Sequence, residues 1–563
     1  MEKNKNIRIV GLYSWHDGGY CVLEDGKIVE HVEIERYNRV KGSHGNSIDY
    51  FKDIYLKNND LKFDDIQHWV SPAPNTNLEK AGNLVFDNPY ENISKDNIHF
   101  YSHHLCHAAH GYFSSKFNDA IILTVDSAGL DTDGLGYSIT VYAGKGNKLT
   151  RMLACREEVF SLGNLWSKMT RFVFKLSSGY PRGCQAGSIM AMAALGNSDK
   201  YYNDIKKMTG PDFQHVRVSP PGMVRGKYVD PEDEVFHPYL NKYKEIAEDE
   251  KEKFNLAASL QRVTEETIFD IISQGIAAAK NSGFKTKNLV LVGGVNLNSV
   301  STGKVAKNLN NWGLENVFVP PVPYDGGLNM GACQYHYHSI LDIPRNKDFV
   351  SPYLGESYSR ASIDQAVNAR KKEVNVFEAV NIKKCASLLN EGKIISIFQG
   401  KSESGRRALG NRSILANPAL ENMKDTINKK VKHRQWYRPF APSVLEEHGK
   451  DWFENFFASP YMGFVFNIKK EKLGKACAIE HFDGTARIQS VNKDQNSSYY
   501  NLINEFYKLS GIPMILNTSF NDREPICETP EHAIDCYLRT EIDLLYFPEY
   551  ELLLSRSSSI PEA

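Results

Sequence analysis

Two histidines spaced four residues apart are the sharpest chemical signal in the sequence. In Ser102-His-His-Leu-Cys-His-Ala-Ala-His110, a helix would place His103 and His107 on one face, about 5–6 Å apart. Neutral imidazoles at that spacing suit adjacent positions on iron, zinc, nickel or copper, and carboxylates often complete the shell. Asp126 and Asp325, each beside a glycine-bearing loop, are the candidate carboxylates. Helix capping or surface exposure would also explain an isolated histidine pair, so the pair alone defines no site.

The elements that must position these residues follow a strand, loop, strand, turn, strand pattern that occurs twice. The first copy covers residues 7–34 and turns at Asp25-Gly26, whereas the second covers residues 120–155 and turns at residues 144–147. Loops without a Cβ let backbone N–H groups approach an anion closely. The two copies resemble the duplicated architecture of the actin, sugar-kinase and Hsp70 superfamily and favour a nucleotide held between related halves. Two unrelated hairpins remain the alternative.

Further along the chain, residues 254–272 have apolar positions three and four apart and predict a long amphipathic helix. The apolar strand at residues 288–292 runs into Gly293-Gly294, a position where α/β sheets collect ligands. The periodicity breaks near residues 340–375. We therefore predict an α/β protein with a domain at residues 1–345, a linker at 346–375 and a second α/β domain at 376–563.

Bulk properties narrow the classes of function. A chain of 563 residues is too long for one hydrophobic core, and 67 Lys and Arg residues nearly cancel 68 Asp and Glu residues. No overall charge therefore draws the protein to nucleic acid or an anionic membrane. Nine scattered cysteines without a C-x-x-C pair, and no apolar run of about 18 residues, predict a soluble cytoplasmic protein with free thiols. A homodimer is compatible with these data.

Longer motifs, taken in order, resemble the O-carbamoyltransferase family of nodulation-factor and antibiotic biosynthesis, the NodU/CmcH type that includes tobramycin carbamoyltransferase. The motifs that carry the resemblance are His16-Asp17, residues 35–41, 103–107, Val125-Asp126, 293–298, 325–327, 405–418, 437–445, 483–487 and 516–521. They extend over nearly the whole chain.

The resemblance implies a fold and a reaction. The N-terminal domain would be a duplicated actin-like (ASKHA) domain, similar to the tRNA threonylcarbamoylation factor, with Fe(II) or another divalent metal on His103, His107, Asp126 and Asp325. The C-terminal domain would be YrdC-like and would form carbamoyl adenylate from its co-substrates carbamoyl phosphate and ATP, with Mg²⁺ accompanying the ATP. The carbamoyl group would then pass at the metal site to a hydroxyl of a small-molecule acceptor in secondary metabolite biosynthesis.

The resemblance also assigns roles to single residues. His16, at the tip of the first hairpin, is the candidate general base, with phosphate binding as its alternative, and Lys41 is a second catalytic candidate. The nucleotide contacts would be Ser127, Gly129, Gly293, Gly294, Asn296 and Asn298. Guanidinium forks suit a small dianion, and the carbamoyl phosphate set would be Arg407, Lys432, Arg438, Arg487, Asn517, Asn521 and Arg523.

Three positions depart from the family pattern. Ala186 and Ser188 replace an acidic residue and a lysine, and Gly42 stands where a histidine is usual, with His44 nearby. These changes predict altered acceptor or nucleotide contacts, although a repurposed N-terminal site is also compatible. The alternatives for the whole chain are an actin-like small-molecule kinase, a maturation factor that carbamoylates a macromolecule, and a non-catalytic nucleotide-binding protein. The sequence does not identify the acceptor.

Overall fold

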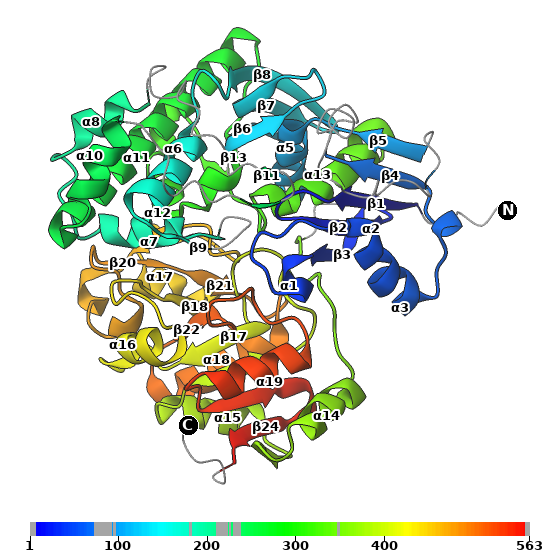
Figure 1. Cartoon of the computed structure of the whole chain (residues 1–563), viewed down its shortest axis with the longest axis vertical. Coiled ribbons are helices and arrows are strands. Elements are labelled where there is room, and N and C mark those ends of the chain that lie inside the picture. The colour runs from blue at the N-terminus through cyan, green and yellow to red at the C-terminus, as the bar shows by residue number, and fades with distance from the viewer. Residues whose placement is uncertain are drawn as a thin grey trace. The chain divides into compact units, whose positions relative to one another are not determined.

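The structure is a computed structural model that describes residues 7–72, 93, 97–178, 183–209, 223–224, 227–228, 238–345 and 349–557 (Figure 1). The chain divides into two compact units. The first unit comprises residues 1–27 and 42–348, and the second comprises residues 28–41 and 349–563. Helices and strands alternate in both, which confirms the predicted α/β class. In the described part of the chain, no helix has the length and apolarity needed to cross a membrane.

The first unit contains two sheets with the same topology. In one, β1 pairs antiparallel with β2 and parallel with β4, and β4 pairs parallel with β5. In the other, β6 pairs antiparallel with β7 and parallel with β13, and β13 pairs parallel with β14, while β8 extends the sheet beyond β7. The repeat seen in the sequence is therefore a repeat of strand order. The strands are β1 (Arg8–Tyr13), β2 (Gly19–Glu24), β4 (His68–Ser71), β5 (Ile98–Phe100), β6 (Asp119–Leu130), β7 (Gly136–Lys145), β8 (Lys148–Arg156), β9 (Ser177–Ser178), β10 (Gly183–Cys184), β11 (Met223–Val224), β12 (Lys227–Tyr228), β13 (Asn288–Val292) and β14 (Asn316–Phe318).

Three helices of the first unit, α6, α11 and α12, begin at a side chain that accepts a hydrogen bond from a backbone N–H of the first turn. The long helix α11 starts after Asp249, whose carboxylate accepts a hydrogen bond from the N–H of Glu252, and α12 starts after Asn298, which accepts one from Ser301. The helices are α2 (Ser47–Tyr50), α3 (Lys57–Asn59), α5 (His103–Ser114), α6 (Leu162–Lys168), α7 (Ala186–Ala193), α8 (Tyr202–Lys207), α10 (Pro238–Ile246), α11 (Glu250–Asn281), α12 (Ser299–Lys307) and α13 (Leu328–Tyr335).

Helices α5 and α13 pack closely against each other, α5 on β13 and α13 on β1 (Figure 1). A Cβ at Gly331 of α13 would overlap the backbone carbonyl oxygen of Cys106 in α5, and a Cβ at Gly111 of α5 would meet the Val292 side chain. The absence of a side chain at Gly331 lets the two helix backbones approach, and its absence at Gly111 lets α5 approach β13. Ala108 and Ala109 of α5 extend this contact into a core that includes Ile122 and Val290.

The second unit is built on one eight-stranded sheet, in the order β15-β24-β23-β16-β17-β22-β18-β21. The strands of this sheet are β15 (Val374–Phe377), β16 (Ile395–Phe398), β17 (Arg412–Ala416), β18 (Ala441–Leu445), β21 (Gln489–Val491), β22 (Met514–Ser519), β23 (Leu544–Phe547) and β24 (Leu552–Arg556). Outside this sheet, the unit contains the paired strands β19 (Val465–Asn467) and β20 (Thr485–Arg487) and all but the first residue of β3 (Lys27–Glu33). Its helices are α1 (Glu35–Asn38), α14 (Arg360–Ala369), α15 (Ile382–Asn390), α16 (Met423–Thr426), α17 (Gly449–Trp452), α18 (Ser497–Ser510) and α19 (Pro530–Arg539).

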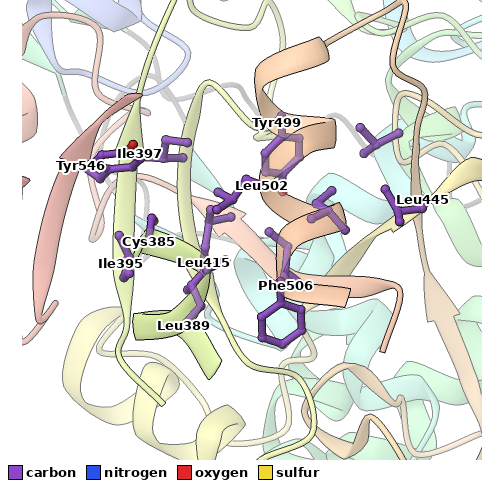
Figure 2. Packing of buried hydrophobic residues seen from close by; sticks show 14 of the residues in the cluster. Cys385, Leu389, Ile395, Ile397, Leu415, Leu445, Tyr499, Leu502, Phe506 and Tyr546 are labelled. Carbon is purple, nitrogen blue, oxygen red and sulfur yellow. The ribbon is translucent and has the colours of Figure 1, made fainter. Parts of the chain in front are cut away.

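Apolar side chains between α15, α18 and this sheet form the core of the second unit (Figure 2). Leu389 comes from α15, and Leu502 and Phe506 come from α18, where their spacing places them on the face that meets Ile397 and Leu415 of β16 and β17. All five are buried. Each of these strands is buried along its whole length, including the polar residues Ser396 of β16 and Arg412 and Ser413 of β17.

A short segment near the N-terminus belongs to the second unit. The guanidinium of Arg36 donates to the backbone carbonyls of Glu403 and Gly405, and the Glu33 carboxylate accepts a hydrogen bond of 2.9 Å from the N–H of Gly405. Arg36 and Glu33 are both buried. Residues 28–41 are thus fixed to the loop that precedes β17, more than 360 residues away in the sequence.

Replacing Gly331 with alanine tests the close approach of α5 and α13. Because the new Cβ would overlap a backbone oxygen, we expect Gly331→Ala to destabilise the protein by about 1–3 kcal/mol, measured as a lower thermal unfolding midpoint. Gly187→Ala in α7 is the matched control, since its Cβ would lie 3.8 Å from the nearest atom, and it should be neutral or stabilising by about 0.5–1 kcal/mol. Equal midpoints for the two variants would contradict the packing argument.

Candidate functional site

Four side chains of the first unit converge on one point, and they are the four predicted metal ligands: His103, His107, Asp126 and Asp325. Their ligand atoms all lie within 4.8 Å of one another. Nε2 of His103 is 3.2 Å from Oδ2 of Asp126, and Nε2 of His107 is 3.3 Å from Oδ1 of Asp325. All four residues are buried, with exposed fractions of 7% or less. We call them the four-residue cluster.

Each part of the fold brings one or two members to this cluster. Helix α5 presents both histidines one turn apart, β6 carries Asp126, and Asp325 begins the 3-10 turn before α13. The close contact of α5 with α13 therefore sets the separation between the imidazoles and Asp325. The N–H of Gly294 donates to Oδ1 of Asp126 at 3.3 Å, which leaves Oδ2 directed at the histidines.

Asp131 fixes the start of α5, a role that the sequence did not predict. Its carboxylate accepts hydrogen bonds from the backbone N–H and Nδ1 of His104, and it is paired with Arg151 at 3.2 Å. The N–H of His104 belongs to the first turn, where helices have no internal partners for their donors. A carboxylate at that end also interacts favourably with the helix dipole. The Ser102 hydroxyl adds a hydrogen bond to Thr132 in the same loop.

The charges in the cluster are strongly coupled. Burial raises the pKa of Asp126, but hydrogen bonds from His103 and His107 outweigh it and hold this pKa well below its usual range. Burial lowers the pKa of His107, whereas hydrogen bonds to Asp126 and Asp325 raise it to a net value of about 9. Nε2 of His107 nevertheless has no hydrogen-bond partner of good geometry in the described part of the protein. Two buried carboxylates beside two imidazoles, with Nε2 of His107 left without a partner, have the composition of a divalent transition-metal site.

His16 lies at the rim of the cluster, in the loop between β1 and β2. Nε2 of His16 is 3.5 Å from Oδ2 of Asp325, and Nδ1 is 3.2 Å from the carboxylate of Asp17. Burial lowers the pKa of His16, but the hydrogen bond to Asp17 and the charges of Asp325 and Asp126 raise it to about 9. The hydroxyl of Tyr13 donates to the same oxygen of Asp325. His16 thus has the acidic partners of a protonated imidazole, and its side chain is 47% exposed.

Two of the predicted nucleotide residues, Gly129 and Gly294, border the cluster. A Cβ at Gly129 would overlap the ring of His103, and Gly293 has a φ of +92°, so the backbone at both positions requires glycine. The side-chain oxygen of Asn298 accepts the capping hydrogen bond of α12, and its amide nitrogen donates to Gln261. Both polar atoms of this side chain therefore make structural hydrogen bonds. Oδ1 of the buried Asn296 has no hydrogen-bond partner among the described residues.

The remaining predicted positions of the first unit lie on nearby elements. Ser127, in β6, accepts a hydrogen bond on its backbone carbonyl from the Ser161 hydroxyl. The departures Ala186 and Ser188 lie in α7, where Ser188 is buried. The carbonyl of Gly42 accepts a hydrogen bond from the N–H of Asp17, next to His16. Of the three departures, the substitution at Gly42 is therefore the one tied directly to the loop that carries His16.

Basic side chains gather in the second unit. Burial, followed by the positive charges of Arg407 and Arg438, lowers the pKa of Arg487 well below its usual range. Burial and the neighbouring Arg438 and Arg487 do the same to Arg434. Nε of Arg487 is buried and has no hydrogen-bond partner in the described part of the chain. We call Lys41, Arg407, Lys432, Arg434, Arg438 and Arg487 the cationic group. Arg434 is a member that the sequence reasoning missed.

Lys432 is held by a small set of acceptors. Its Nζ donates to the carbonyl oxygens of Ser519 and Asn521 at 2.9 and 2.6 Å and to Oδ1 of Asn521. Burial, with Arg434, Lys41 and Arg438 nearby, lowers the pKa of Lys432 to about 7. The amide nitrogen of Asn521 donates to Glu524, so the Asn521 side chain is fully engaged in positioning Lys432.

Asn517 lies on β22 with one unused acceptor. Its Nδ2 donates to the carbonyl of Ala408, to the Ser443 hydroxyl and to Oε1 of Gln489. Its Oδ1 is buried without a partner among the described residues. The predicted Arg523, by contrast, is exposed and donates to the carbonyl of His433.

Lys41 lies in the second unit, although the sequence suggested that it belongs to the N-terminal domain with His16. Burial and the charges of Arg438 and Arg406 lower the pKa of Lys41, while Glu35 and Glu524 oppose them. Arg39, two residues earlier, donates to the carbonyls of Pro525 and Ile526 and so fixes this segment. The signal that could have revealed this placement is absent from local sequence, because the contacts span nearly 490 residues.

Comparison with known proteins identifies the family. The family model for the carbamoyltransferase N-terminus matches residues 74–334, and the model for the carbamoyltransferase C-terminus matches residues 386–553. An uncharacterized protein of Methanocaldococcus jannaschii is 32% identical over 84% of this chain and 77% of its own length. The chain belongs to the carbamoyltransferase family. Nodulation protein NolNO of Sinorhizobium fredii is 30% identical over 97% of this chain and 80% of its own length.

The carbamoyltransferase assignment makes the chain a transferase enzyme. The four-residue cluster lies inside the N-terminal match, and every member of the cationic group except Lys41 lies inside the C-terminal match. A solved structure of full-length HypF in its phosphate- and nucleotide-bound form aligns with a TM-score of 0.33 and 14% identity over 60% of this carbamoyltransferase and 56% of that chain. That likeness is too distant to support any statement about this site.

The lowered pKa of Lys432 predicts a pH-dependent stability. Between pH 7 and 10.5 the unfolded lysine binds a proton that the folded lysine does not, so Lys432 makes the free energy of unfolding rise with pH in that window. The slope is at most about 1.4 kcal/mol per pH unit, and Lys432→Met should remove it in urea titrations at several pH values. Lys429→Met, at an exposed neighbour, is the control and should keep the slope. Parallel pH profiles for wild type and Lys432→Met would contradict the assignment.

Proposed function

We propose that this carbamoyltransferase is an ATP-dependent O-carbamoyltransferase that makes carbamoyl adenylate in its second unit and delivers the carbamoyl group to a hydroxyl of a small molecule at the four-residue cluster. The observation that carries the proposal is the presence, in one carbamoyltransferase chain, of a buried carboxylate and imidazole cluster and of a separate cationic group. One has the composition of a metal site and the other that of a polyanion site.

The cationic group supports activation in the second unit. Half-buried guanidinium groups that depress one another's pKa are costly in the isolated protein, and bound phosphates would remove that cost. Arg407, Arg438 and Arg487 would hold carbamoyl phosphate and the ATP phosphates. The free Oδ1 of Asn517 could accept from the carbamoyl amino group, while Asn521 acts through Lys432 and Arg523 stays at the exposed edge.

Conversion of carbamoyl phosphate to carbamoyl adenylate would take two steps. Water first displaces inorganic phosphate from carbamoyl phosphate and leaves carbamate. A carbamate oxygen then attacks the α-phosphorus of ATP, the bond to the β-phosphate breaks, and pyrophosphate departs. Mg²⁺ would accompany the nucleotide. The cationic group would neutralise the negative charge that develops on the departing phosphates.

The four-residue cluster supports delivery in the first unit. Its two imidazoles and two carboxylates, with the unsatisfied Nε2 of His107, fit Fe(II) or a similar divalent ion, which when bound would polarise an oxygen of the carbamoyl donor. The acceptor hydroxyl oxygen attacks the carbamoyl carbon. The bond between that carbon and the phosphate oxygen of AMP breaks, and AMP leaves. His16, beside Asp325, is the candidate to receive the hydroxyl proton, in the neutral form that it would adopt once a bound ion offsets the charges of Asp325 and Asp126.

The same proposal assigns the finer structural classes. The repeated sheet order of the first unit supports an actin-like, ASKHA-type unit, with Ser127, Gly129, Gly293, Gly294, Asn296 and Asn298 near a nucleotide, although the side chain of Asn298 already caps α12. We assign the second unit to the YrdC-like type. We further propose that the enzyme acts in the cytoplasm on a secondary metabolite.

Loss of a guanidinium fork should block activation. We expect Arg487→Lys to reduce carbamoyl phosphate-dependent pyrophosphate release by about 10²–10³-fold, because lysine keeps the charge but not the bidentate geometry. The measurement is labelled pyrophosphate formed from ATP without an acceptor. Arg370→Ala is the control, since Arg370 is exposed and paired with Glu373 and Asp535. Undiminished release by Arg487→Lys would rule out the proposed role of the cationic group.

Removal of a cluster ligand should block delivery and spare activation. We expect His107→Ala and Asp325→Asn to bind metal more weakly and to lower the rate of carbamoyl transfer to an acceptor by at least about 100-fold. Pyrophosphate release should continue at the wild-type rate. Leu105→Ala on the same helix is the control for packing. Product is read by mass spectrometry across a panel of hydroxylated metabolites as the gain of one carbamoyl group. The γ-phosphate of ATP appearing on an acceptor would instead identify a kinase.

A further inference from the structure

A second histidine group lies in the first unit, outside the four-residue cluster. His68 begins β4, His99 lies in the middle of β5, and His336 follows the last residue of α13. One ring nitrogen from each lies within 4.8 Å of the other two. The ring centroids of His68 and His99 are 4.6 and 4.5 Å from that of His336. We call these residues the three-histidine group, and neither the sequence reasoning nor the proposed reaction uses it.

His336 has the features of a prepared ligand. It is 1% exposed, and its Nε2 is buried with no hydrogen-bond partner among the described residues. Its Nδ1 lies 2.6 Å from the Tyr101 hydroxyl. When Nδ1 carries the proton and donates to the phenol oxygen, Nε2 keeps its lone pair free. Histidines that bind metals are commonly oriented in this way, by a partner on the nitrogen that does not bind.

We propose that His68, His99 and His336 together bind one divalent transition-metal ion of the zinc type. Three imidazole nitrogens suit zinc, cobalt, nickel or copper, whereas magnesium and calcium prefer oxygen ligands. A tetrahedral zinc with Zn–N distances of about 2.0–2.1 Å needs ligand atoms about 3.4 Å apart, so small rotations of the two half-exposed rings would close the site. Water would take the fourth position.

Packing of three uncharged rings is the simpler explanation of the group, and it leaves one atom unexplained. Ring packing gives Nε2 of His336 no partner, and a buried polar atom without one is costly. A metal ion supplies that partner.

Metal binding would fasten the edge of the first sheet. Strand β5 has only three residues and pairs with β4 at three positions. An ion held by His68, His99 and His336 would link β4, β5 and the end of α13. The site therefore has a structural role that does not depend on the reaction proposed for the four-residue cluster.

The test uses the full chain with the four-residue cluster disabled by His103→Ala and His107→Ala. Metal-free protein is titrated with Zn²⁺ against a chromogenic chelator, and with Co²⁺ by its visible absorption. We expect this background to bind one equivalent, and the further change His68→Ala or His99→Ala to weaken binding by about 100-fold. Adding His448→Ala is the matched control, since this half-exposed histidine pairs with Asp451 in the second unit.

Two results would overturn the proposal: a folded background variant that binds no Zn²⁺, or binding that survives both His68→Ala and His99→Ala. Should the background variant fail to fold, the stoichiometry of Co²⁺ on otherwise wild-type protein decides. A fall of one equivalent on His68→Ala supports the site, and an unchanged stoichiometry refutes it. Zn²⁺ should also raise the thermal unfolding midpoint of the background variant and leave that of its His68→Ala derivative unchanged.

Discussion

Asp126 and Asp325 are both buried, and each approaches His103 and His107 to within 3.8 Å. Two carboxylates in one desolvated place repel each other and lose their hydration, so the arrangement persists only when positive charge is shared among them. His107, whose pKa is raised, supplies positive charge in the isolated chain, and a divalent ion would supply more. The close packing of α5 on α13, the anchor of Asp131 at the start of α5 and the glycines at positions 129, 293 and 331 all serve to hold this pairing.

The second unit presents the same problem with the opposite sign. Guanidinium groups and lysines lower one another's pKa, and Lys432 and Arg434 are fixed mainly by uncharged acceptors, such as the backbone oxygens of Ser519 and Asn521 and the amide oxygen of Asn428. A protein that leaves such a group without full compensation is prepared for an anion from outside. The carbamoyltransferase thus has a site suited to cations in one unit and a site suited to anions in the other, as the proposed reaction requires.

Local patterns predicted the elements well where the physical cause is local. The apolar runs at residues 120–126 and 288–292 became β6 and β13, and the spacing of His103 and His107 became one face of α5. The repeated hairpins reappear as two sheets with the same strand order. Contacts between distant segments were not predictable in the same way. Arg434 looks like any surface arginine in the sequence, and no local pattern indicates that the Asn298 amide contacts Gln261.

By itself, the sequence determined the α/β class, the repeated hairpins, the family and the identity of the four clustered residues. Each of these follows from residue types, from the short spacing of apolar or histidine residues, or from motifs in a fixed order. The tertiary structure alone decided that residues 28–41 join the second unit, that Lys41 lies near its arginines, and that His68, His99 and His336 meet. Those placements depend on how separate elements pack, and packing is set by shape and burial across hundreds of residues, which no local pattern encodes.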